Sequence, residues 1–379
     1  MVASIASGGR YYRPELDVVR FFAFFLVFLF HTVPTGDDPR LAHHSKVFLF
    51  ILDIFQNAFS FGVCLFFALS AFLICELLLR EKEIIGTVSV KQFYFRRILR
   101  IWPLYYFALA HGVIICVIYG HQVEITRFIW YAIFLGAWDT TLRGVFLNPI
   151  SPLWSISIEE QFYLFAPWAV QLISRKSLYG FCAAIILGAN IRLYFLCKAS
   201  ASLLVVWTNA LVQFECFAAG IVLCLVLRSR LPRIALWKRL LLFVGGWSFW
   251  LYASYIQQVS DTFSNWPLTC ARYTLIALGS VLLIVAVLGV NRKRLPAWAI
   301  YLGRISFGLY VYHMFAIELS RIIFGHYAAF TGPAYYLKAI LALGLTLLMA
   351  ALSYRFLETP FLKMKKRHAV IESQPIRGD

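Results

Sequence analysis

The sequence predicts an all-α polytopic membrane protein with about ten transmembrane helices and one short re-entrant or interfacial segment. The first observation is composition: of 379 residues, 61% are hydrophobic and 14% are charged, and the mean hydropathy is +0.76. A soluble chain of this length could not bury so much apolar surface, so lipid must be the solvent of most side chains. The second observation is that apolar windows of about 20 residues, the length that spans a bilayer, recur along the whole chain.

The third observation is the distribution of the net charge of +17. The apolar windows predict spans at residues 18–34, 59–79, 102–119, 152–174, 178–197, 203–227, 238–256, 271–290, 298–320 and 335–356. With the N-terminus inside, about 25 of the 35 basic residues fall on the cytoplasmic side and about 8 outside, as the positive-inside rule requires. The basic character therefore indicates orientation, with both termini cytoplasmic, and argues against nucleic acid as a partner.

The remaining segments are short. Residues 127–138 are apolar but too short to cross, and a crossing here would invert every later loop, so this is the re-entrant or interfacial segment. The first apolar run is followed by HTVPTGDD and not by a small-residue cleavage site, which predicts an uncleaved first span. We expect one transmembrane domain over 1–379, with a short cytoplasmic tail at 361–379. The eight cysteines lack metal-ligand spacing, so no metal site is predicted.

The first span carries ionisable residues, which are costly in lipid and therefore functional candidates. Asp17, Arg20, Phe24, Val27 and His31 recur at spacings of three and four, so they share one helix face. His31 ends a ten-residue apolar run and lies roughly 16 Å beyond Arg20, in the outer half of the bilayer. A histidine that only reaches the outer interface would give the same pattern, so position alone leaves both readings open.

The fourth span contains two adjacent carboxylates in SPLWSISIEEQFYLFAPW. Ser151 followed by Pro152 is typical of an N-cap and a first helical residue. Glu159 and Glu160 then lie about 10–13 Å below the outer end and point about 100° apart, so both cannot face the same partner. A buried carboxylate must be paired or protonated, which is hard to explain by packing alone.

Three further ionisable residues are predicted inside the membrane. His313, in the ninth span, lies in the outer half, 15 residues from the inner end of that span. Arg192 falls toward the outer side and Glu215 near mid-depth. For each of these residues a structural ion pair and a functional role stay open.

A second polar group gathers at the inner face. KQFYFRRILRIWP supplies Arg96, Arg97 and Arg100, and the last span adds Arg355 and Glu358 at the same level. Ordinary positive-inside arginines would also lie here, but three on one turn beside Arg20 suit a polyphosphate. The two groups suggest a molecule with an anionic end at the cytoplasmic face and a reactive end in the membrane, where a histidine with a carboxylate would do base chemistry. Acyl-coenzyme A has this shape.

These stretches resemble the acyltransferase-3 family of integral membrane acyltransferases, which O-acylate sugars of cell-surface glycans and some other hydroxylated products. The resemblance covers nearly the whole chain, through RPELDVVRFFAFFLVFLFH, FGVCLFFALSAFLI, FRRILRIWPLYY, PLWSISIEEQFYLFAPW, ISFGLYVYH and YRFLETPF. Each motif is weak alone, and the six in this order are specific.

The resemblance implies roles for individual residues. His31 matches the family's essential histidine, Arg20 the arginine before it, and Arg97 with Arg100 the paired-arginine motif of the acyl-CoA side. Glu159 matches the carboxylate of the Trp-Ser-Leu-x-x-Glu motif. The other matched or candidate positions are Asp17, Gly62, Phe66, Phe67, Ser70, Trp154, Ser155, Arg192, Tyr310, His313, Glu358 and Pro360.

The chain departs from the family pattern at two positions. Ala71 stands where the family commonly has glycine, and the larger alanine is expected to tighten helix packing or narrow a channel. Thr359 stands where the family usually has arginine, so one charge at the inner face is missing. Neither touches the expected catalytic pair. Some members carry a C-terminal extracytoplasmic esterase-like domain, which this chain is expected to lack.

The expected function is transfer of an acyl group, most often acetyl in this family, from cytoplasmic acyl-CoA to a carbohydrate hydroxyl. The acceptor would be a cell-surface polysaccharide or a lipid-linked sugar. The protein is expected to lie in a bacterial inner membrane. Arg20, Arg97 and Arg100 would hold the phosphates of the donor substrate, and no tightly bound cofactor is expected. His31, oriented by Glu159, would act as general base or carry the acyl group transiently. The acceptor, the acyl chain and the oligomeric state are not assigned.

The alternative class is a proton-coupled transporter or flippase in which His31, Glu159 and His313 form a relay. It predicts discontinuous helices in two repeated halves, and the sequence shows no repeat. A non-catalytic membrane scaffold would leave the buried carboxylates unexplained.

Overall fold

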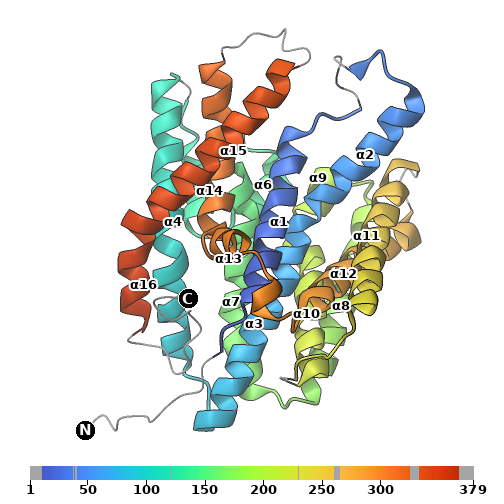
Figure 1. The fold of residues 1–379 in the computed structure, drawn as a ribbon, viewed down its shortest axis with the longest axis vertical. Helices are drawn as coiled ribbons and strands as arrows, with labels where there is room; N and C mark the ends of the chain where they lie inside the picture. Colours follow the sequence, from blue (N-terminus) through green and yellow to red (C-terminus); the bar gives the residue numbers. More distant parts are fainter. Residues whose placement is uncertain are drawn as a thin grey trace.

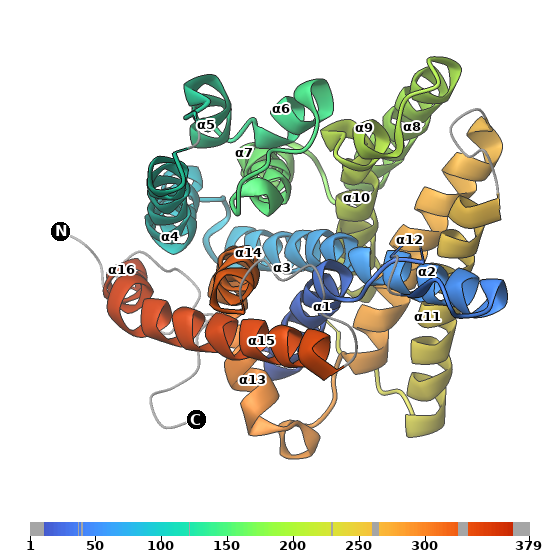
Figure 2. The same cartoon turned by 90° about the horizontal axis from the view of Figure 1, so that it is seen from above.

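The computed structural model describes residues 11–36, 38, 41–120, 122–228, 230–259, 265–324 and 333–366, and within these ranges it holds helices and loops but no strand. The helices form one bundle whose long members run along the vertical axis of Figure 1. Seen from above, α1, α3 and α14 lie at its centre and the other helices surround them (Figure 2). The all-α fold is confirmed.

The long helices coincide with the predicted spans. They are α1 (Pro14–Thr32), α3 (Gly62–Ile85), α4 (Val90–Ile118), α7 (Trp154–Leu172), α8 (Ser177–Lys198), α10 (Ala210–Leu227), α11 (Leu236–Val259), α12 (Trp266–Val287), α14 (Ser306–Ile323) and α15 (Pro333–Ser353). Six described segments are long and apolar enough to cross a membrane, namely Lys46–Ile85, Val90–Ile118, Ser177–Lys198, Ala210–Leu227, Trp266–Val287 and Tyr335–Met364. A multi-pass membrane protein is thereby supported, and the count of ten spans stays a prediction.

One helix was absent from the predicted spans. Residues 46–60 form α2 (Lys46–Ser60), whose N-terminus is capped by Ser45, since its hydroxyl accepts a hydrogen bond of 3.2 Å from the Phe48 N–H. α2 meets α3 at Phe61, so the second predicted span is part of a longer apolar segment.

Two predicted spans are divided in the structure. Residues 203–227 form α9 (Leu203–Trp207) and α10, and residues 298–320 form α13 (Ala297–Arg304) and α14. A Cβ atom at Gly303 would lie 1.9 Å from the Asp17 carbonyl oxygen, so only glycine lets α13 lie directly against α1. The count of 15 residues along one continuous helix therefore does not give the depth of His313, because Ile305 separates α13 from α14, and its place in the outer half stays a prediction.

The short apolar segment at 127–138 is a pair of helices and not a single one. α5 (Ile125–Ala132) and α6 (Gly136–Arg143) have eight residues each, or about 12 Å, so neither can cross the bilayer core. They are separated at Phe134, where φ is 58°. A buried ion pair of 2.8 Å between Arg127 and Asp139 joins them.

The structure also corrects two helix ends. Residues 151–153 form a 3-10 turn (Ser151–Leu153), α7 begins at Trp154, and no side chain caps it, so the predicted N-cap at Ser151 is wrong. At the other end of the chain, a π-helical turn (Tyr354–Glu358) leads into α16 (Thr359–Lys366), which lies beside α4. The first part of the predicted tail is thus helical, and its residues 367–379 lie outside the described part.

Close packing at the centre holds α3 against α10. A Cβ atom at Gly220 would lie 2.1 Å from the Ala68 carbonyl oxygen and 2.9 Å from the Ala71 Cβ, so the two backbones almost touch. Ala71, where the resemblance expects glycine, is thus accommodated by a glycine on the facing helix. This packing fixes the direction of α3.

Candidate active site

Two cavities lie along α1, one near each end. The first, which we call the arginine cavity, has a volume of about 90 Å³ and is lined by Arg20. The second, the histidine cavity, has a volume of about 760 Å³ and is lined by His31. Val63 and Tyr310 line both, so they form the boundary. Arg20 and His31 are separated by 11 residues of helix, roughly 16 Å.

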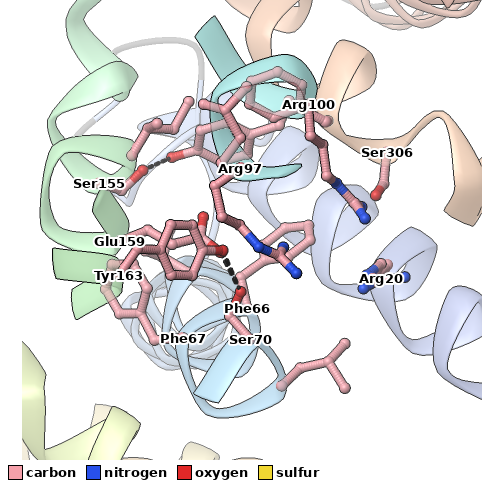
Figure 3. A pocket seen from close by; sticks show the side chains of 16 residues that line it. Arg20, Phe66, Phe67, Ser70, Arg97, Arg100, Ser155, Glu159, Tyr163 and Ser306 are labelled. Atoms are coloured by element: carbon pink, nitrogen blue, oxygen red, sulfur yellow. Dashed lines mark hydrogen bonds between the residues drawn. The ribbon is translucent and has the colours of Figure 1, made fainter. Parts of the chain in front are cut away.

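Three guanidinium groups from α1 and α4 face the arginine cavity: Arg20, Arg97 and Arg100 (Figure 3). Asp17 is buried and forms a 2.7 Å ion pair with Arg20, which makes it the residue that positions this arginine. The predicted triplet on α4 is reduced to a pair, because Arg96 points away and forms a 2.9 Å ion pair with Glu81.

Arg97 and Arg100 form no ion pair with a carboxylate within the described ranges. The guanidinium of Arg97 lies over the ring of Tyr163 at 5.3 Å, and its Nε is buried without a hydrogen-bond partner. A cavity with this excess of positive charge is suited to an anion.

Glu159 belongs to the arginine cavity. Its carboxylate accepts hydrogen bonds from the hydroxyl groups of Ser70 and Tyr163, whose oxygens lie 3.0 Å apart (Figure 3). The structure shows no hydrogen bond between Glu159 and His31, whose Nδ1 is bonded to Val27, so the expected pair of histidine and orienting carboxylate is not formed by these described residues. Glu160 points elsewhere and accepts a 3.3 Å hydrogen bond from Trp102 Nε1, which confirms that the two carboxylates face different partners.

His31 lies half-buried at the wall of the histidine cavity, and its hydrogen bond defines its tautomer. Its Nδ1 is 2.9 Å from the Val27 carbonyl oxygen. Because a carbonyl oxygen only accepts, Nδ1 must carry the proton and donate it. The neutral ring therefore keeps its lone pair on Nε2, the state that a general base requires.

His313, and not a carboxylate, is the neighbour of His31. The two ring centroids are 5.0 Å apart. His313 is fully buried, its Nδ1 is hydrogen-bonded to the Tyr310 carbonyl oxygen, and its Nε2 has no partner among the described residues. It does not line the cavity. The sequence singled out both histidines, and only the alternative transporter interpretation placed them together.

Tyr310 and Ser155 form the junction between the cavities. Their hydroxyl oxygens are 2.6 Å apart, and the Tyr310 hydroxyl also lies 3.1 Å from the Pro152 carbonyl oxygen, to which it donates. Trp154, which precedes Ser155, lines the histidine cavity and packs edge-on against Trp207, with 6.4 Å between the ring centroids. The predicted Trp-Ser motif therefore lies at the point where the two cavities adjoin.

Three other ionisable candidates lie away from both cavities. Glu358 is buried in the π-helical turn, Arg192 lies on α8, and Glu215 accepts a 2.9 Å hydrogen bond from the Thr274 hydroxyl. None of them lines either cavity. In the described ranges, no group of three or more His, Cys, Asp or Glu side chains is arranged to hold a metal ion.

Sequence analysis missed three charged residues that line the histidine cavity, Arg272, Glu318 and Arg321. Arg272 is buried on α12 and lines the histidine cavity. The sequence did offer one indication of Arg272: it lies at the outer end of the predicted span 271–290, where the positive-inside rule disfavours an arginine.

Comparison with known proteins shows similarity over most of the chain. Residues 13–355 match the family described as acyltransferase domain. The chain is 26% identical over 328 residues to a Staphylococcus aureus (strain COL) protein named "Putative O-acetyltransferase", covering 80% of this chain and 52% of that protein. It is 28% identical over 340 residues to peptidoglycan O-acetyltransferase OatA of Listeria monocytogenes, covering 80% of this chain and 51% of that protein.

A viral protein is similar as well. The chain is 25% identical over 326 residues to a protein of Acidianus two-tailed virus named "Putative acetyltransferase", covering 77% of this chain and 87% of that protein. The chain spans about half the length of the two bacterial relatives. No solved structure matches it.

Proposed function

The chain belongs to the acyltransferase-3 family, and from this premise we propose that it is a membrane O-acyltransferase that transfers an acyl group from acyl-CoA to a carbohydrate hydroxyl. The observation that carries the proposal is the pair of adjoining cavities. One presents three arginines, the other presents a histidine in the tautomer of a base, and Tyr310 lies between them. A donor with an anionic end and a distant thioester fits this arrangement.

The arginine cavity would hold the donor. Arg20, Arg97 and Arg100 would bind phosphate groups of coenzyme A, because guanidinium groups form paired hydrogen bonds to phosphate. At about 90 Å³ the cavity is far smaller than the roughly 300–1,000 Å³ of pockets that enclose a whole ligand. Only the narrow pantetheine arm would therefore enter, and the nucleotide would stay at the mouth.

His31 would act as general base at the junction. Its Nε2 takes the proton of the acceptor hydroxyl while the hydroxyl oxygen attacks the thioester carbonyl carbon. The C–S bond then breaks, an ester forms, and the proton passes from the imidazolium to the departing coenzyme A thiolate. The hydroxyl groups of Tyr310 and Ser155 could stabilise charge on the carbonyl oxygen only if they turned away from the hydrogen bonds that they donate in the structure. A transient acyl group on His31 is the other route to the same products.

The histidine cavity would hold the acceptor. Its volume of about 760 Å³ is within the range of pockets that enclose small ligands. One bacterial relative is named a peptidoglycan O-acetyltransferase, which supports acetyl as the acyl group and a cell-surface glycan as the acceptor. We place the chain in a bacterial inner membrane with both termini cytoplasmic, so that the arginines face the coenzyme A pool.

A proton relay has less support. The adjacent rings of His31 and His313 would suit one. Glu159 contacts Ser70 and Tyr163 and neither histidine, so the expected three-residue relay does not form.

The function is tested by mass spectrometry of surface polysaccharides and glycosides from cells with and without the gene. We expect ester-linked acyl groups that are present only with the gene and are removed by mild base. The purified protein should release free coenzyme A thiol from acetyl-CoA only when extract from the deleted strain supplies the acceptor. Equal acylation in both strains, together with no acceptor-dependent thiol release, would contradict the proposal.

The orientation makes a separate prediction. Leu142 on α6 is 69% exposed and Lys176 between α7 and α8 is exposed, and they lie on opposite sides in the proposed topology. In intact cells, an impermeant maleimide should label Leu142→Cys but not Lys176→Cys until the membrane is opened. Labelling of Lys176→Cys alone in intact cells would reverse the orientation.

A further inference from the structure

Arg272 is a buried cation whose hydrogen bonds are incomplete. It lies on α12, is 1% exposed, and lines the histidine cavity. Its Nη2 donates to Gln257 Oε1, while Nε and Nη1 are buried without a hydrogen-bond partner in the described chain. A guanidinium has five N–H donors, and buried donors in native proteins are nearly always satisfied. The missing partner is therefore a property of the site that needs an explanation.

The protein's own side chains do not neutralise this charge. The rings of Phe61 and Tyr273 lie 5.9 Å and 5.4 Å from the guanidinium carbon, and such contacts stabilise a cation without accepting in-plane N–H hydrogen bonds. No carboxylate in the described ranges forms an ion pair with Arg272. A buried charge without a counterion is costly.

The other charges at the histidine cavity cancel each other. Glu318 and Arg321 line it and form a 3.2 Å ion pair, in which the Arg321 side chain is 51% exposed. Arg272 is thus the unbalanced charge among the residues that line this cavity. Gln257 also donates a 3.4 Å hydrogen bond to Asn57 Oδ1, which directs its own carbonyl oxygen at the guanidinium and holds Arg272 in place.

We propose that Arg272 binds an oxyanion carried by the acyl acceptor, either the carboxylate of an acidic sugar or the phosphate of a lipid-linked sugar. This inference rests on the proposed function, because it takes the cavity beside His31 as the acceptor site. A carboxylate or phosphate would satisfy both free N–H groups and the charge together. A neutral acceptor would leave the buried cation unpaired, so the cavity discriminates in favour of acidic acceptors.

The test measures ligand binding and does not depend on turnover. Trigalacturonate and its fully methylated ester supply a carboxylate and a neutral counterpart, and farnesyl phosphate and farnesol supply a phosphate and a neutral counterpart. Binding of each to the protein in lipid nanodiscs is compared among wild type, Arg272→Met, Arg272→Lys and Arg143→Met. The last variant is the matched control, because Arg143 lines neither cavity and its partner Asp139 keeps its ion pair with Arg127.

We expect one anion to bind wild type and Arg143→Met with similar affinity, and the neutral counterpart of that anion to bind both at least tenfold more weakly. Arg272→Met should weaken the binding of that anion by about tenfold or more. A response to trigalacturonate alone identifies an acidic sugar, and a response to farnesyl phosphate alone identifies a lipid-linked phosphate. Arg272→Lys keeps the charge but not the planar fork of N–H donors, so its loss of anion affinity should be intermediate. It replaces Arg272→Met in the comparison if the Met variant does not fold.

The proposal is overturned if neither anion binds wild type more tightly than its neutral counterpart, or if the folded Arg272 variants bind both anions as wild type does. Binding of a coenzyme A analogue shows in each variant that the fold is kept. Failure of the proposed function would appear differently, as absent acyl transfer in wild type with Arg272-dependent anion binding intact.

Discussion

Replacement of His31 by alanine is expected to abolish acyl transfer while acyl-CoA binding stays close to that of wild type. A general base contributes about 10²–10⁴-fold to a rate, and His31 has its lone pair on the nitrogen that faces away from the Val27 carbonyl oxygen. The arginines that would hold the donor are roughly 16 Å away along α1, so donor affinity should not change. Single-turnover release of coenzyme A thiol, with binding of a coenzyme A analogue measured in parallel, checks both parts.

His313→Ala is the control for this experiment. His313 touches His31 but does not line the cavity, so its loss should reduce the rate less than the loss of His31. The double variant should be hardly slower than His31→Ala, because residues that act as a unit are not additive. If His31→Ala keeps more than about a tenth of wild-type turnover, less loss than removal of a general base causes, the histidine is an interface anchor and the mechanism is wrong.

Replacement of Arg97 and Arg100 together by alanine is expected to weaken acyl-CoA binding by about 100-fold or more, because each removes a charge-assisted contact worth roughly 1.5–3 kcal/mol. Each single variant should lose about tenfold, and each Arg→Lys variant should retain part of the affinity, since lysine lacks the planar fork. Binding of a non-reactive coenzyme A analogue to the protein in nanodiscs measures the effect. The loss should shrink at high salt, because exposed phosphates are screened.

Arg96→Ala is the matched control for the donor site. Arg96 is on the same helical turn and carries the same charge, but it pairs with Glu81 and does not line the arginine cavity. It should leave affinity within a few-fold of wild type. Equal losses from Arg96→Ala and Arg97→Ala would mean that the general field of the inner face, and not a defined site, attracts the donor.

The positions of most long helices could be predicted from the sequence, because the bilayer restricts the segments that can cross it. A spanning helix needs a run of about 20 apolar residues whatever it packs against, so the long helices coincide with the predicted spans. Within one helix the 3.6-residue period also relates side chains to one another. Asp17, Arg20 and His31 could therefore be placed on one face of the first span, and α1 does carry Arg20 into one cavity and His31 into the next.

Contacts between helices could not be predicted in the same way. The period of a helix says which residues share a face but not which neighbour that face meets, because rotation and spacing depend on close packing such as that of Gly220 on Ala68. For this reason Glu159 was paired with His31 in prediction, whereas in the structure it binds Ser70 and Tyr163. The position of Arg272 at the outer end of a predicted span was a signal in the sequence. That its Nε and Nη1 lack hydrogen-bond partners beside a cavity could be seen only in the structure, because this depends on how the facing helices pack.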